Sequence, residues 1–228
     1  MCFSATASFT AAVGLSLLGI GTIRQARSKR YLLLASFPCL FALQQSLEGL
    51  VWTGINNESL SQLTMVGTYG FLLFATFLWL ILSPLSIYFL EQDKQKKRVL
   101  LGLTALGFLL GAYLLIWIIY DGIEPQVFSG NIFYDLKLIP FYEPNKYLYL
   151  SIVSIPFLIT ESPLLKLFGS LSIISFIISQ ILFQVTFVSV WCFFAALLSG
   201  FIYLTMKQLS SETENHKIPL IIDKESDI

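Results

Sequence analysis

The chain has 228 residues and no formal net charge, and 12% of its residues are charged against 56% that are hydrophobic. A soluble domain carries about twice that share of charged residues, so this composition argues against a water-soluble globular protein. The zero net charge gives no support for a nucleic-acid partner. The apolar residues also occur in long runs, which indicates that the lipid bilayer is the solvent.

Seven apolar runs each have roughly the length that an α-helix needs to cross a bilayer. In hydrocarbon, backbone polar groups must be satisfied within the segment, which favours helices. Charged segments separate the first run from the second and the third from the fourth. Pro163 favours a helix end between the fifth run and the sixth. The sequence therefore predicts an all-α transmembrane helix bundle with spans at 4–23, 31–54, 64–90, 98–120, 147–163, 164–183 and 185–206.

Basic residues set the expected orientation of this bundle. With seven spans, twelve of the 14 lysine and arginine residues fall on one side of the membrane, and Lys137 and Lys146 fall on the other. Cytoplasmic loops carry the excess of basic residues in membrane proteins. We therefore expect the N-terminus outside and the C-terminus in the cytoplasm.

The chain divides into two predicted parts. Residues 1–207 are predicted to form one transmembrane domain, and residues 208–228 are predicted to form a polar, flexible cytoplasmic tail. The outer loop 121–146 holds acidic and aromatic residues and three prolines. A short hairpin around Ser129–Asn131 and a helix lying on the membrane interface both fit its sequence, and we leave the two open.

Glu48 is the most informative polar residue within a predicted span. It lies about six residues, or roughly 9 Å, from the outer end of its helix. An ionisable group there costs a few kcal/mol and usually faces the bundle interior or a water-filled cavity. Gln44 and Trp52 are one turn away on the same face, and Gln45 is an i,i+3 neighbour. Because burial disfavours the charged carboxylate, this stripe suits proton titration or ligand binding. A protonated glutamic acid that joins helices is the structural alternative.

Other predicted helices place polar residues at a similar depth. Ser4 begins the first helix, Gln180 follows a face of serines on the sixth, and Trp191 lies on the seventh. If these faces converge, they form a polar pocket in the outer half of the bundle. Ordinary packing of small residues between membrane helices is the alternative. The predicted members of this pocket are Glu48, Gln44, Gln45, Ser4, Trp52, Trp191 and Gln180.

Cys2 and Cys192 are the candidate metal ligands. Methionine aminopeptidases remove Met before a small residue, so the mature chain could begin with Cys2. An N-terminal cysteine offers an amine and a thiolate, which together suit a soft metal. An inert interfacial cysteine is the alternative for Cys2, and the sequence names no cofactor.

Several familiar catalytic and cofactor-binding motifs are absent from the predicted spans. They contain no histidine, which disfavours histidine-ligated haem and zinc, and the seventh span has no lysine for a retinal Schiff base. There is no GxSxG motif and no nucleotide-binding loop, so an enzyme is not favoured. Gly107 and Gly111 form a small-xxx-small pair that indicates a packing or dimer seam.

Three segments carry a resemblance: MCFSATASF at the start, FALQQSLEGLVW in the second predicted helix and VSVWCFFAALLS in the seventh. Together they resemble the DUF6629 type, an uncharacterised family of bacterial multi-pass membrane proteins. The resemblance covers the membrane region up to about Lys207. It implies a bacterial inner membrane and brings no activity with it. The family-type positions that it implies are Cys2, Ser4, Gln45, Glu48, Trp52, Trp191 and Cys192.

Three classes of function follow from these observations. The leading hypothesis is a transporter, channel or sensor whose pocket around Glu48 binds or passes a small ligand, a proton or a metal ion. The second is a membrane redox, metal or haem-binding enzyme that uses the thiolate of Cys2. The third is a structural or assembly protein. The expected partners are the lipid bilayer and a small-molecule or ion ligand, and a homo-oligomer stays open.

Overall fold

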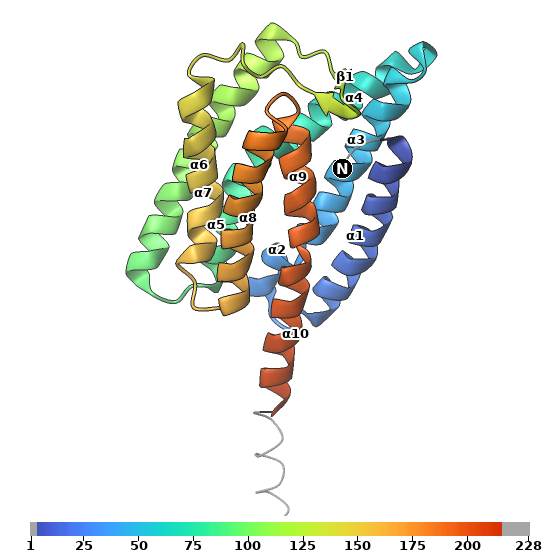
Figure 1. Ribbon diagram of the computed structural model, residues 1–228. Coiled ribbons are helices and arrows are strands. Elements are labelled where there is room, and N and C mark those ends of the chain that lie inside the picture. Colours follow the sequence, from blue (N-terminus) through green and yellow to red (C-terminus); the bar gives the residue numbers. More distant parts are fainter. Residues whose placement is uncertain (1–3, 216–228) are drawn as a thin grey trace, which may run out of the picture.

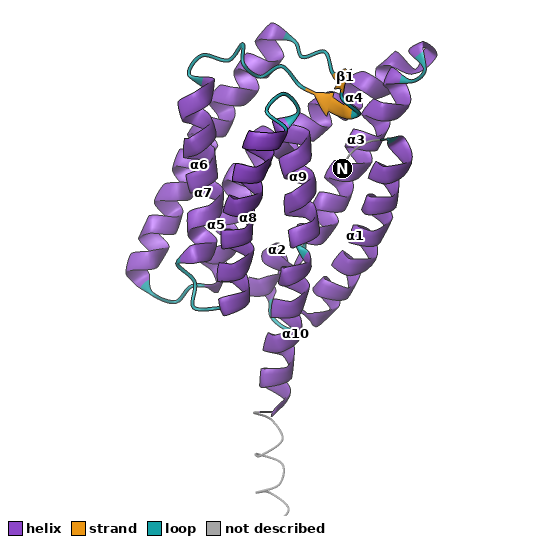
Figure 2. Ribbon diagram, in the orientation of Figure 1, coloured by secondary structure: helices purple, strands orange, loops and turns teal. Residues whose placement is uncertain are grey.

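A computed structural model describes residues 4–215, apart from the side chains of Glu58 and residues 211–215. Its helices run side by side in one bundle (Figure 1), and a small hairpin is the only strand structure within the described range (Figure 2). The predicted all-α class is confirmed.

Each predicted apolar run is helical in the structure, with local breaks. The first is α1 (Ala5–Gln25), and the second comprises η1 (Lys29–Tyr31), α2 (Leu32–Ala35) and α3 (Phe37–Ile55). After η2 (Glu58–Leu60), the third comprises α4 (Ser61–Leu73), the π-helical turn η3 (Phe74–Leu78) and α5 (Trp79–Leu90). The others are α6 (Lys94–Asp121), α7 (Tyr142–Leu158), α8 (Pro163–Leu182), α9 (Phe187–Leu198) and α10 (Gly200–Asn215).

Five helical segments of the described chain are long and apolar enough to cross a membrane. They are Ala5–Gln25, Ser61–Leu90, Lys94–Asp121, Pro163–Leu182 and Phe187–Ser210. The other two predicted spans correspond to α3 and α7. The 19 residues of α3 include two glutamines and a glutamate, which lower its hydropathy, and α7 has only 17 residues.

The two largest boundary differences from the sequence-based prediction concern α7 and α10. The fifth predicted span, 147–163, begins earlier as α7 and ends at Leu158, while Pro163 begins α8. Proline fits there because the first helical position needs no N–H partner. At the other end of the chain, α10 continues to Asn215, past the predicted start of the tail, and the rest of that tail lies outside the described residues.

The loop after α6 forms a hairpin, which is one of the two structures that its sequence left open. β1 (Gln126–Phe128) pairs antiparallel with β2 (Asn131–Phe133). Ser129 and Gly130 form the two-residue turn, with φ angles of 48° and 75°. Such positive values suit the turns that match strand twist in hairpins. In Figure 1 the hairpin lies at one end of the bundle, and α10 extends from the opposite end.

Asp93 caps the start of α6 at the end of the bundle opposite the hairpin (Figure 1). Its Oδ1 accepts hydrogen bonds from the backbone N–H groups of Gln95 and Lys96 at 2.7 and 2.9 Å. These bonds satisfy two of the N–H groups that a helix start leaves without intrahelical partners. The bonds from Lys96 and Gln95 hold the pKa of the Asp93 carboxyl below its usual range.

Gly107 packs α6 directly onto the backbone of α5. A Cβ atom at Gly107 would collide with the carbonyl oxygen of Leu80, whereas a Cβ at Gly102 on the same helix meets no atom within 4 Å. Gly111 lies against Phe77 in the same way. The predicted small-residue seam is thus a packing seam within the chain.

We expect Gly107→Ala to destabilise the bundle by about 1–3 kcal/mol, because overpacking forces backbone shifts. Thermal unfolding in detergent, followed by tryptophan fluorescence, would measure the change. Gly102→Ala is the matched control and should be neutral or slightly stabilising, since alanine favours helix more than glycine does. Equal transition temperatures for the two variants would contradict this packing.

Candidate functional site

Glu48 lies in the interior of the bundle, where the sequence places it. Its side chain is 0% exposed, and the Ser189 hydroxyl of α9 donates a hydrogen bond to Oε1 at 2.5 Å. The thiol of Cys192, one turn further along α9, lies close to Glu48 as well. The Glu48 carboxyl therefore links α3 to α9 through this hydrogen bond.

Gln44 connects Glu48 to a third element. Its Oε1 accepts a hydrogen bond from the indole Nε1 of Trp79 at 2.8 Å, and its side chain lies near Cys192. Trp79 follows the π-helical turn η3 directly, and its ring stacks on Phe41 with centroids 4.0 Å apart. Isolated π-helical turns are frequent at functional sites. Gln44, Glu48, Trp79, Ser189 and Cys192 are called the buried polar cluster below.

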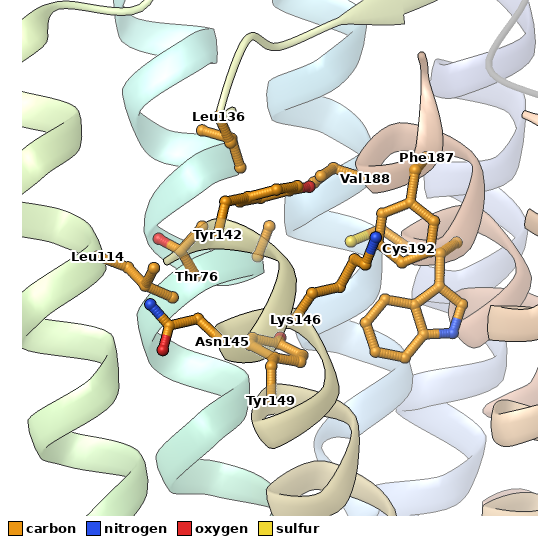
Figure 3. Close-up of a pocket in the computed structure, with 12 residues that line it drawn as sticks. Thr76, Leu114, Leu136, Tyr142, Asn145, Lys146, Tyr149, Phe187, Val188 and Cys192 are labelled. Carbon is orange, nitrogen blue, oxygen red and sulfur yellow. The ribbon is translucent and has the colours of Figure 1, made fainter. Parts of the chain in front are cut away.

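Two cavities adjoin this cluster. The loop-side cavity, about 50 Å³, lies among η3, α6, the loop, α7 and α9, with Lys146, Tyr142 and Asn145 among its polar lining (Figure 3). The core-side cavity, also about 50 Å³, is lined by aromatic rings and by Ser83 and Ser172. Three side chains line both cavities and so form their shared wall: Tyr149, Trp191 and Cys192.

The size of the cavities restricts what they can hold. A water molecule needs at least roughly 10–15 Å³ of such volume, so each cavity has room for a few waters. Pockets for drug-sized ligands occupy about 300–1,000 Å³. In this structure the cavities therefore suit water, protons or small ions, and they are too small for a metabolite.

Lys146 is a buried cation that the sequence did not assign to the site. Its side chain is 5% exposed, and Nζ pairs with the Glu143 carboxylate at 2.7 Å. The ammonium also lies 5.5–5.6 Å from the ring centroids of Tyr142, Tyr147 and Phe187. Such cation–π contacts and the ion pair offset the cost of burial. Figure 3 shows the amine beside the ring of Phe187, at the loop-side cavity.

Trp191 is held rigidly at the wall between the cavities. Its Nε1 donates a hydrogen bond to the Ser172 carbonyl of α8 at 3.2 Å. Its ring stacks on Phe187 at 5.6 Å and meets Tyr149 and Phe176 edge-on at 5.6 and 5.1 Å. An aromatic cluster in such geometry fixes the shape of the wall.

Three predicted pocket members lie away from the cavities. Ser4 caps α1, where its Oγ accepts a hydrogen bond from Ala7 N at 3.2 Å. Trp52 is buried in α3, and its Nε1 has no hydrogen-bond partner among the described residues. Gln180 is half-buried near the end of α8. None of these three lines either cavity, and neither do the fully buried Glu48, Gln44 and Gln45, so Trp191 is the one predicted pocket member that does.

The two predicted metal ligands have different outcomes. Cys2 lies outside the described residues. Cys192 is a buried free thiol with Gln44 and Glu48 as its polar neighbours. Within residues 4–215, no three or more His, Cys, Asp or Glu side chains gather in a way that could hold a metal ion.

Sequence reasoning missed three side chains of this region: Trp79, Ser189 and Lys146. Trp79 had a usable signal, because an indole N–H in the middle of an apolar span needs an acceptor. Ser189 belongs to the VSVW segment, where small residues also serve ordinary packing. Lys146 was counted only for orientation, because nothing in its local sequence indicates that the side chain turns inward.

Comparisons with known proteins give one match. The sequence model of a family described as "Family of unknown function (DUF6629)" matches residues 1–217. Neither the curated proteins nor the solved structures contain a match to the chain.

Proposed function

The chain belongs to the DUF6629 family, a family of unknown function, and we propose that it is an integral membrane protein that moves protons through the buried polar cluster, with Glu48 as the group that binds and releases the proton. We place it in the bacterial inner membrane with seven spans, an external N-terminus and a cytoplasmic C-terminus. The asymmetric distribution of lysine and arginine supports this orientation.

The observation that carries the proposal is the position of the cluster relative to the two cavities. Cys192 lines both cavities and lies close to Glu48. Each cavity has the volume of a few waters, and waters bridge polar groups almost as well as direct hydrogen bonds do. We infer that a proton passes from water in one cavity to the cluster and on to water in the other.

Each member of the cluster has a role in this scheme. Glu48 takes up a proton and becomes neutral, which burial favours. The Ser189 hydroxyl can donate a hydrogen bond to Oε1 in either protonation state, since a carboxylate and a carboxyl both accept there. Gln44 is oriented by Trp79 and lies beside Glu48 and Cys192. The rigid wall of Trp191 and Tyr149 keeps the two cavities apart, so that passage depends on the cluster.

The ammonium of Lys146 borders the loop-side cavity, where the Glu143 carboxylate at 2.7 Å offsets its charge. A positive charge repels a metal cation and an excess proton alike, so Lys146 does not select between them.

Reconstitution into liposomes tests the proposal. Vesicles with a trapped pH-sensitive dye would receive an imposed pH gradient, with valinomycin and K⁺ present to remove any opposing potential. We expect the gradient to decay faster in vesicles that contain the protein than in protein-free vesicles. Equal decay rates would overturn proton movement as the function.

A further inference from the structure

A large groove lies at the hairpin end of the bundle, separate from the two cavities. It has a volume of about 1090 Å³, and its walls come from the end of α3, the first turns of α4, the end of α6 and the segment 122–138. It shares no lining residue with either cavity. Stacking of Tyr134 on Phe71, with centroids 5.1 Å apart, holds the segment over α4. A volume of this order accommodates an organic ligand.

The groove is negatively charged and has no cation of its own. The carboxylates of Asp121, Glu124 and Asp135 line it, and no lysine or arginine does. None of the three carboxylates forms an ion pair among the described residues. A concave surface with charges of one sign raises the local concentration of the opposite charge. The groove therefore attracts cations.

A second, independent feature of the groove is an unsatisfied hydroxyl. Thr68 lines the groove and is 1% exposed, and its Oγ1 has no hydrogen-bond partner among the described residues. A buried hydroxyl without a partner is costly. A ligand with an N–H donor would satisfy it, because a hydroxyl oxygen accepts hydrogen bonds.

The arrangement of the carboxylates discriminates between classes of cation. A Ca²⁺ ion takes six to eight oxygen ligands at 2.3–2.6 Å, so its carboxylates must converge. No three acidic side chains gather in that way within the described chain. The groove lining also includes the apolar side chains of Ile55, Met65 and Leu138. Carboxylates that do not converge, in a groove that also has apolar lining, match a chain of methylenes that joins separate ammonium groups.

We propose that this groove binds an elongated organic polycation of the polyamine class. Its ammonium groups pair with Asp121, Glu124 and Asp135, and its methylenes lie on Ile55, Met65 and Leu138. The site is distinct from the proton path and does not depend on it.

Isothermal titration of spermidine into the full chain, held in zwitterionic lipid nanodiscs, tests this site. We expect saturable binding to the wild type and its loss in Asp121→Asn/Glu124→Gln/Asp135→Asn. The matched control, Glu161→Gln, removes an exposed carboxylate elsewhere and should bind as the wild type does. Should the triple variant fail to fold, Thr68→Val provides a near-isosteric test and should weaken binding several-fold.

Competition experiments separate the classes of ligand. Excess Mg²⁺ at matched ionic strength should leave spermidine bound. Absence of saturable binding to the wild type would overturn the proposal, as would unchanged binding in both groove variants. Displacement by Mg²⁺ at equal concentration, or tighter binding of tetralysine than of spermidine, would also overturn it, in favour of a metal ion or a basic protein segment.

Discussion

Glu48→Gln is expected to reduce the decay of an imposed pH gradient in proteoliposomes to the rate of protein-free vesicles. Glutamine keeps the shape of the side chain and can still accept the hydrogen bond from Ser189, but it cannot ionise. Because all proton transfer in the proposed path passes through this carboxyl, the loss should be complete. The fold should persist, since no buried charge is left without its partner.

The matched control for this substitution is Glu161→Gln. The Glu161 side chain is 93% exposed, and among the described residues its one ion pair is with Lys96 at 3.6 Å, at the surface. Removal of such a pair costs little, so this variant should transport protons as the wild type does. Size-exclusion profiles and circular dichroism would verify that both variants fold. A Glu48→Gln protein that folds and still dissipates the gradient would contradict the assignment of Glu48.

Gln44→Met is expected to destabilise the protein by about 1–3 kcal/mol. Methionine fills a similar volume, but it leaves the indole N–H of Trp79 buried without an acceptor. A buried donor that has lost its acceptor costs its full desolvation free energy. Unfolding in a graded denaturing detergent mixture, followed by tryptophan fluorescence, would measure the change. Gln62→Met, at an exposed position of α4, is the matched control and should fall within about 0.5 kcal/mol of the wild type.

A double-mutant cycle gives this prediction a sharper form. In Gln44→Met/Trp79→Phe neither partner of the hydrogen bond remains, so no polar group is left unsatisfied there. The loss in the double variant should therefore be smaller than the sum of the two single losses. Strict additivity would show that the bond between Gln44 and Trp79 does not exist in solution.

The helical architecture could be predicted from the sequence because the bilayer allows so few solutions for a long apolar run. Each predicted run is helical, and the fifth and sixth runs are separate helices, although the break lies before Pro163 and not after it as predicted. Finer features had no comparable signal. The start of α7 at Tyr142, ahead of the apolar run, and the π-helical turn before Trp79 both depend on tertiary packing. The hairpin stayed open because polar, aromatic sequence suits either a turn or an interfacial helix.

The site could be predicted only in part, for a similar reason. Glu48 and Gln44 were identifiable because polar groups inside an apolar span are expensive and must face the interior. Their partners on other helices were not, because helix rotation decides which residues meet, and periodicity alone does not fix rotation. Trp191 was expected as a wall of the pocket and lines both cavities, whereas Ser4, placed in the same pocket, caps its own helix.

The polar stripe also explains why α3 is missing from the five helices with the hydropathy and length of a membrane span. Gln44, Gln45 and Glu48 are fully buried, so the stripe faces protein and not lipid. Hydropathy counts residues without regard to the direction they face. A helix in the centre of a bundle can therefore hold polar groups at membrane depth when its neighbours surround it.

Infrared difference spectroscopy of the protein in lipid, between acidic and alkaline pH, tests the central claim most directly. The C=O stretch of a protonated carboxyl is separate from the amide bands, so a buried glutamic acid that titrates gives a pH-dependent band. We predict such a band in the wild type and in Glu161→Gln, and its disappearance in Glu48→Gln. Identical difference spectra for the wild type and Glu48→Gln would show that Glu48 does not exchange a proton, and the proposed path would be wrong.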